Sequence, residues 1–201
     1  YPDYAVRPDT PREEYYSVVY IEPVNTRNLR ALGYDMFTEP TRRAAMEKAC
    51  ETNTATISGK VILVQETTED VQPAFLMYLP VYEKNKSHET VEQKTDALQG
   101  FVYSAFRTHD LFNAMLPILQ EAKTSDIRIK VYDGAKSDEN LLYDSKAGTP
   151  DHTWIKSVNV DFGHRTWLVE FSRIHTFSDF ETSVLVAIPA SLISTFHRTS
   201  R

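Results

Sequence analysis

The residue with the clearest capacity for ligand chemistry is Asp35, in the segment ALGYDM at residues 31–36. Tyr34 and Met36 flank it, so we expect its carboxylate to be partly buried, and a buried carboxylate needs hydrogen-bond donors from the protein or from a ligand. Asp is also common near helix starts, where its oxygens accept free backbone N–H groups. The residues alone therefore leave two roles open for Asp35, ligand anchoring and helix capping.

Other patterns that could carry chemistry are weak. The six histidines are scattered without short spacing to carboxylates, and a single cysteine, Cys50, permits neither an internal disulfide nor a cysteine-based zinc site. The triplet Asp161-Phe162-Gly163 matches the kinase metal-binding motif only by letter and predicts a hairpin turn. The sequence contains neither a nucleophile elbow nor a glycine-rich phosphate loop. We therefore expect no catalysis, no metal and no other cofactor.

Composition narrows the choice of partner. The 201 residues suffice for one large domain or two small ones, and the net charge of −6 comes from interspersed charges without a basic stripe. Nucleic acid is accordingly not an expected partner. The chain reads as a piece of a longer protein, and the mostly apolar run at residues 184–196 fits either a terminal strand or a truncated membrane helix.

Hydrophobic periodicity predicts the elements that must position these residues. A helix is expected from Pro40, with apolar residues on one face at 45, 46, 49 and 50 and with Asn53 as a left-handed terminator. A second helix is expected at residues 111–119, and the charged stretch 83–97 is expected to be an exposed loop. Alternating or apolar runs predict strands at residues 17–22, 54–64, 75–82, 100–106, 127–132, 141–143, 154–162 and 166–171.

This order of elements predicts an α+β fold with two modules, each built from a small antiparallel sheet and one or two helices. The run at residues 75–82 is apolar on both faces, as a strand covered on both sides would be. Five motifs then occur in one order and spacing: VYIEP at 19–23, LGYDM at 32–36, PTRR at 40–43, ISGKVILVQE at 57–66 and FLMYLPVY at 75–82.

Together these motifs resemble CHASE domains, the extracytoplasmic sensors of bacterial receptors that also occur in plant cytokinin-receptor kinases. The resemblance is specific over about residues 15–106. It implies two tandem PAS-like modules, a membrane-distal ligand-binding module at residues 1–100 and a membrane-proximal module at 101–201. It also implies flanking transmembrane helices, a homodimer in a full-length inner-membrane receptor, and a periplasmic location.

The resemblance also implies a binding site in the first module for a small, planar, polar molecule such as an adenine-like compound. Asp35 matches the carboxylate that hydrogen-bonds the ring, and Ile57 matches the apolar residue that packs on it. Strands at 61–66, 75–79 and 101–105 would line the remainder. The ligand-binding residues implied in this way are Asp35, Ile57, Val61, Leu63, Glu66, Phe75, Met77 and Tyr103. Tyr103-Ser104 stands where the plant pocket is expected to carry a glycine pair, which argues against the plant hormone itself.

Two functions compete at this point. The chain is expected to be a small-molecule sensor that signals to a cytoplasmic output domain, which could be a histidine kinase or a cyclic-di-GMP enzyme. The alternative is a structural or dimerising extracytoplasmic module without a small ligand. An enzymatic role for this chain ranks third.

Overall fold

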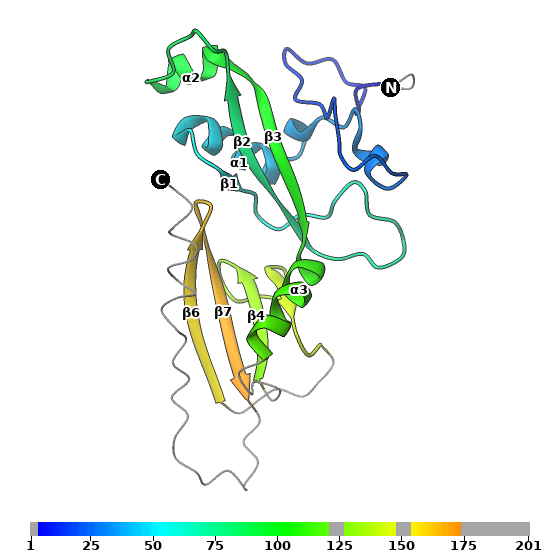
Figure 1. The fold of residues 1–201 in the computed structure, drawn as a ribbon, viewed down its shortest axis with the longest axis vertical. Coiled ribbons are helices and arrows are strands. Elements are labelled where there is room, and N and C mark those ends of the chain that lie inside the picture. The colour runs from blue at the N-terminus through cyan, green and yellow to red at the C-terminus, as the bar shows by residue number, and fades with distance from the viewer. Residues whose placement is uncertain (1–3, 121–126, 148–153, 174–201) are drawn as a thin grey trace, which may run out of the picture.

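The computed structural model describes residues 4–120, 127–147 and 154–173 and shows an α+β fold (Figure 1). Two short 3-10 helices, three α-helices and seven strands follow one another in this part of the chain. They are η1 (Asn28–Ala31), η2 (Met36–Thr38), α1 (Pro40–Thr52), β1 (Thr56–Ile57), β2 (Ala74–Tyr82), α2 (Val91–Ala97), β3 (Leu98–Arg107), α3 (Thr108–Gln120), β4 (Ile127–Asp133), β5 (Leu141–Asp144), β6 (Trp154–Phe162) and β7 (Arg165–Arg173).

The strands form two separate antiparallel sheets. The first has the order β1-β2-β3, and the second has the order β5-β4-β7-β6. Helix α3 leads from the last strand of the first sheet to the second sheet (Figure 1). Strand β3 continues through residue 100 and ends at Arg107. The boundary between the sheets therefore lies after Arg107, and the expected module boundary at 100/101 falls inside this strand.

Helix α1 begins and ends where local chemistry requires. Glu39 accepts the N–H groups of Thr41 and Arg42 at 3.0 and 2.9 Å, and Pro40 occupies the first turn, where its missing N–H costs nothing. Asn53 ends the helix with φ of 54°, in the left-handed region that Asn tolerates. The predicted helix start and terminator are both confirmed.

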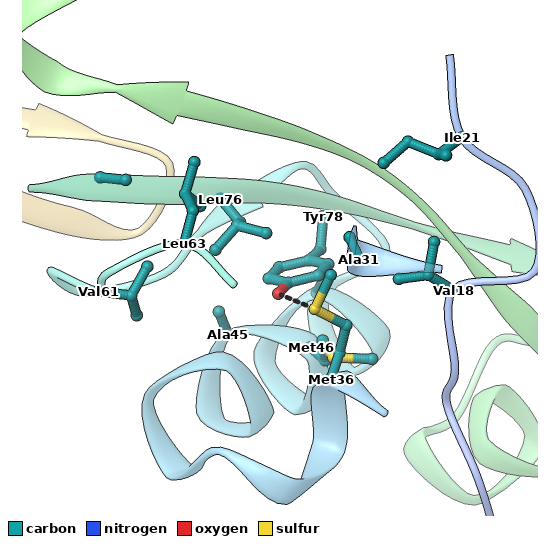
Figure 2. Close-up of a cluster of buried hydrophobic side chains, with 12 residues drawn as sticks. Val18, Ile21, Ala31, Met36, Ala45, Met46, Val61, Leu63, Leu76 and Tyr78 are labelled. Atoms are coloured by element: carbon teal, nitrogen blue, oxygen red, sulfur yellow. Dashed lines mark hydrogen bonds between the residues drawn. The ribbon is translucent and has the colours of Figure 1, made fainter. Parts of the chain in front are cut away.

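Strand β2 divides the protein into two cores because its side chains alternate. Leu76 and Tyr78 point toward α1, whereas Phe75 and Met77 point toward the second sheet. The α1-facing core comprises Val18, Ile21, Ala31, Met36, Ala45, Met46, Ala49, Val61, Leu63, Ala74, Leu76 and Tyr78 (Figure 2). The junction core comprises Ile57, Phe75, Val131, Leu142, Tyr143 and Trp167 and therefore joins both sheets.

One predicted strand is wrong and a second is confirmed only in part. Residues 17–22 make only an isolated bridge between Ser17 and Asp35. Of residues 54–64, only β1 is regular, because Ser58 Oγ takes the N–H of Leu76 and the N–H of Lys60 turns away to Asp133. The segment buries residues 56–59 consecutively and alternates in burial only from 59 to 64, so it is irregular over most of its length.

The expected exposed loop at 83–97 is also partly wrong, because it contains helix α2. Thr90 and Gln93 form a reciprocal capping box, in which the Thr90 side chain accepts the Gln93 N–H and the Gln93 side chain accepts the Thr90 N–H. Strand β2 continues through Pro80, and its register shifts only between Val81 and Tyr82. The strands expected at 127–132, 141–143, 154–162 and 166–171 are confirmed, with Gly163 in the β6–β7 turn. The apolar run at 184–196 lies outside the described residues.

Candidate functional site

Asp35 lies completely buried before η2 and serves as its N-cap. One carboxylate oxygen accepts the backbone N–H groups of Tyr16 at 3.1 Å and Phe37 at 3.0 Å. The other pairs with Arg12, whose Nε and Nη2 lie 3.1 and 2.8 Å away. All these donors come from the protein, so a ligand N–H that reaches this carboxylate has to replace one of them.

The segment before residue 18 supplies most of this enclosure. It is fixed by isolated bridges from Arg7 to Tyr34 and from Ser17 to Asp35 rather than by a regular strand. Tyr16 packs on Phe37 with ring centroids 4.4 Å apart, and burial raises the pKa of its phenol to about 12. Arg12 is more accessible than Asp35, with 23% of its side chain exposed. Arg12 is therefore the partner that a ligand could displace most readily.

An open cavity of about 850 Å³ lies next to this enclosure, between the N-terminal segment and α2. Glu14, Tyr15 and Tyr16 line one side of it, and Val91 and Leu98 belong to the other side. Tyr16 is shared between the cavity wall and the Asp35 enclosure. The cavity volume lies within the usual range for small-ligand sites, about 300–1,000 Å³.

The expected site residues divide between the two faces of the first sheet. Val61 and Leu63 are buried in the α1-facing core, and Tyr103 packs against that core. Ile57 and Phe75 belong instead to the junction core, with Met77 packed against it. The structure thus brings Val61, Leu63 and Tyr103 together on the α1 side of the sheet. Met36, the residue after Asp35, lies in the same core.

Glu66 holds a network of ion pairs at the end of β3. Its side chain is only 4% exposed and pairs with Arg27 and with Arg107, whose Nε lies 2.9 Å away. Arg107 also pairs with Asp70 and Asp110 at 2.8 and 2.6 Å. This network connects the loop before β2 to the start of α3, and the observed partners of Glu66 are all arginines of the chain.

Sequence reasoning missed Arg42, which lies in the α1-facing core with only 2% of its surface exposed. Its Nη2 donates to the carbonyl of Ile62 at 2.9 Å, and its Nη1 reaches the Met36 sulfur at 3.6 Å. The guanidinium also lies over the Tyr34 ring, 5.0 Å from its centroid. A signal was present, because position 42 continues the buried helix face at 45, 46, 49 and 50 backward by one turn.

Two tyrosines face the same core. The Tyr78 hydroxyl donates to the Met36 sulfur over 3.7 Å, a weak acceptor, as Figure 2 shows. Within the part of the chain that the structure describes, the buried hydroxyl of Tyr103 and the Nε of Arg42 make no hydrogen bond. Burial raises the pKa of Tyr103 to about 12, although the charge of Arg42 opposes the rise, so this phenol is a protonated donor at neutral pH.

A second cavity, of about 490 Å³, lies where the two sheets meet. Thr41, Val61 and Ile62 line its first-sheet side, and Asp133 and Arg165 line its second-sheet side. Arg165 holds the Asp133 carboxylate through two bonds of 2.7 and 2.9 Å, and the same carboxylate accepts the N–H of Lys60. Ile62 thus lines this cavity and accepts a hydrogen bond from the buried Arg42.

Within residues 4–120, 127–147 and 154–173, no three His, Cys, Asp or Glu side chains gather as metal ligands would. The same part of the chain has no helix long and apolar enough to cross a membrane. Fold and site together define an α+β protein in which buried polar side chains are enclosed between a helix and an antiparallel sheet.

The chain belongs to the CHASE domain family, because the model of that family matches residues 1–143. The match covers the first sheet, α3, β4 and most of β5. CHASE domains are extracytoplasmic sensor domains of signalling receptors. Among curated proteins, no sequence matches the chain. The resemblance inferred from the five sequence motifs is thereby confirmed.

Proposed function

We propose that this chain is the small-molecule sensor of a membrane-bound signal-transduction receptor and transmits ligand binding to a cytoplasmic output domain. The observation that carries the proposal is the buried carboxylate of Asp35, closed by Arg12 from a segment that isolated bridges and hydrogen bonds hold rather than a regular strand. A bound N–H donor can take the place of Arg12 without breaking either sheet. The receptor would lie in the inner membrane, with this region in the periplasm.

We further propose that the two antiparallel sheets belong to two tandem PAS-like modules. The membrane-distal module would correspond to about residues 1–100 extended by the rest of β3, and the membrane-proximal module would follow it. Flanking transmembrane helices would anchor the full-length receptor as a homodimer. Its output would be a histidine kinase or a cyclic-di-GMP enzyme.

The ligand would be a small, planar, polar molecule on the α1 side of the first sheet. A ring N–H bonded to an ionised carboxylate forms a charge-assisted hydrogen bond, roughly twice as strong as a neutral one. Val61, Leu63 and Tyr103 would supply apolar contact to such a ring. Ile57, Phe75 and Met77 would act at the junction core, where they could report a change in the first sheet to the second.

The alternative function is a structural or dimerising module without a ligand. One observation favours it, since Asp35 already receives backbone and arginine donors and caps η2. In that case the enclosure serves only the fold.

The two functions separate in a binding experiment on the purified chain. Native mass spectrometry would identify any molecule that co-purifies, with adenine as the probe in isothermal titration if none does. For a sensor, Asp35→Asn should weaken binding about tenfold or more, because the charge-assisted bond is lost. Arg12→Gln should tighten binding, because the competing cation is removed.

Asp9→Asn is the matched control, since Asp9 is exposed. A ligand-free chain that binds no small molecule, with Asp35→Asn changing only the melting temperature, would establish the structural function instead.

A further inference from the structure

Three arginines of this protein present the same edge of the guanidinium group to a carboxylate. Arg128 pairs its Nε and Nη2 with the two oxygens of Asp144 at 2.8 and 2.6 Å. Arg165 does the same with Asp133 at 2.7 and 2.9 Å, and Arg107 does so with Glu66 at 2.9 and 3.4 Å. The planar Nε–Nη2 edge matches a carboxylate in spacing and charge, so this pairing is both strong and directional.

Arg42 is more deeply buried than these arginines, yet its Nε–Nη2 edge makes no hydrogen bond to a carboxylate within the described residues. Its Nε has no hydrogen-bond partner, and its Nη2 bonds to a neutral carbonyl, that of Ile62. Its Nε forms an ion pair with Glu39 at 3.8 Å, a distance too long for a hydrogen bond. Glu39 already uses its carboxylate to cap α1 through Thr41 and Arg42. A buried guanidinium left in this way carries a substantial desolvation cost.

Two further donors accompany this edge in the same core. The Tyr103 hydroxyl is buried without a partner, and the Tyr78 hydroxyl reaches only the Met36 sulfur. The positive charge of Arg42 lowers the pKa of both tyrosine phenols, against the larger upward effect of burial. Leu63, Met46 and Leu76 supply apolar surface around them (Figure 2).

We propose that Arg42, with Tyr103 and Tyr78, forms the binding site for a carboxylate group carried by the ligand of this domain. The carboxylate would pair with Nε and Nη2 of Arg42, replace the Ile62 carbonyl at Nη2, and accept the Tyr103 hydroxyl. The apolar remainder of the ligand would lie against Leu63 and Met46. The inference rests on the proposed sensor function and specifies the chemical class of the ligand as a small organic carboxylate.

A route to this site follows from the irregular segment after β1. The carbonyl of Ile62 accepts the bond from Arg42, about half of the residue is exposed, and Ile62 lines the 490 Å³ cavity together with Thr41 and Val61. Release of the single bond from Arg42 to Ile62 would join this cavity to the buried guanidinium. Lys60 and Arg165 line the same cavity together with the acidic residues Asp133 and Glu139.

The test compares matched acids and amides on the purified chain, in a buffer free of carboxylates. Acetate, propionate, benzoate and phenylacetate are titrated in a thermal-shift assay beside the corresponding primary amides. We expect at least one acid to raise the melting temperature saturably and to bind about tenfold or more tightly than its amide. If no acid exceeds its amide, the proposal is overturned.

Two variants locate the effect. Arg42→Lys keeps the positive charge but loses the planar Nε–Nη2 edge. Tyr103→Phe removes only a hydroxyl that has no hydrogen-bond partner in the free protein. Each should weaken acid binding about tenfold, and Tyr103→Phe should not lower the melting temperature of the free protein. Arg30→Lys and Tyr20→Phe are the controls at exposed positions. Unchanged acid affinity in either folded variant would overturn the site, and Tyr103→Phe decides if Arg42→Lys does not fold.

The outcomes also separate this inference from the sensor function on which it rests. Saturable binding of adenine or of a co-purified neutral molecule, without a preference for acids, would remove the carboxylate site and leave the sensor standing. Failure of acids, amides, adenine and co-purification alike would remove both.

Discussion

The backbone N–H of Ile57 donates to the carbonyl of Gly163 over 3.0 Å and so ties the first sheet to the β6–β7 turn. This contact needs a glycine. A Cβ at position 163 would lie 2.8 Å from the Cγ2 atom of Ile57 and 3.1 Å from its backbone nitrogen. Gly163 also has φ of 53°, in the left-handed region. The junction between the sheets is therefore built on a close approach of two backbones.

Gly163→Ala is expected to lower the free energy of unfolding by about 2–4 kcal/mol, because strain at positive φ adds to overpacking against Ile57. Gly134→Ala is the matched control, since Gly134 has φ of 83° and no atom within 4 Å of its added Cβ. The control should cost only about 1 kcal/mol. Urea denaturation of both variants measures the difference, and equal costs would show that the approach to Ile57 contributes nothing.

Glu66→Gln is expected to lower the free energy of unfolding by about 1–3 kcal/mol, because a buried acceptor of charged hydrogen bonds becomes neutral. Asp70→Asn is the comparison, since Asp70 pairs with the same Arg107 but its side chain is 74% exposed. Solvent screens an exposed pair, so Asp70→Asn should leave stability nearly unchanged. Chemical denaturation at neutral pH gives both values, and an equal loss in the two variants would contradict a dominant role for burial.

Asp144 should make stability depend on pH in the acid range. Burial raises its pKa, but hydrogen bonds from Arg128 and from the N–H of Lys146 outweigh burial and hold the pKa below the ordinary 3.8. A carboxylate with a lowered folded-state pKa stabilises the fold above its unfolded pKa, and that stabilisation is lost as pH falls through the folded value. Melting temperatures from pH 6 to pH 2 should fall less steeply for Asp144→Asn than for the parent chain. Asp138→Asn, at an exposed position, should follow the parent chain.

Asp35→Ala is expected to lower the free energy of unfolding by about 2–4 kcal/mol, since it removes the cap of η2 and leaves Arg12 and two backbone N–H groups without their acceptor. Asp35→Asn should recover part of this loss, because an amide oxygen can still accept from Tyr16 and Phe37. Thermal and urea denaturation check the order. A fully stable Asp35→Ala protein would show that these hydrogen bonds to Asp35 do not stabilise the fold.

The sequence predicted regular elements well wherever one period dominated. Strand β2 was predictable because residues 75–82 form an apolar run, although both faces are covered only over the first half and Leu79 and Val81 are exposed. The segment after β1 was not, because the side-chain bond from Ser58 and the acceptor Asp133, 73 residues away from Lys60, both lie beyond any local pattern. Helix α2 was predictable in principle, since Thr90 and Gln93 have capping-box spacing. The charged residues around them favoured an exposed loop instead.

The candidate site could be predicted only in part. Asp35 was singled out by its neighbours Tyr34 and Met36. The sequence left ligand anchoring and helix capping open for it, and in the structure its carboxylate caps η2 and also pairs with Arg12. Arg42 was passed over because a charged residue near a helix start is usually solvated. Arg42 contacts the Tyr34 ring, which precedes it in the sequence, and the Ile62 carbonyl, which follows it by 20 residues, and a local pattern predicts neither contact.

Strand β3 ends at Arg107, and helix α3 begins at the next residue, Thr108, without a loop between them. Thr108 is completely buried, its N–H donates to Pro73 and its hydroxyl donates to the carbonyls of Pro73 and Leu142. The end of β3 is therefore joined to the second sheet through a single residue, Thr108, and not through an intervening loop.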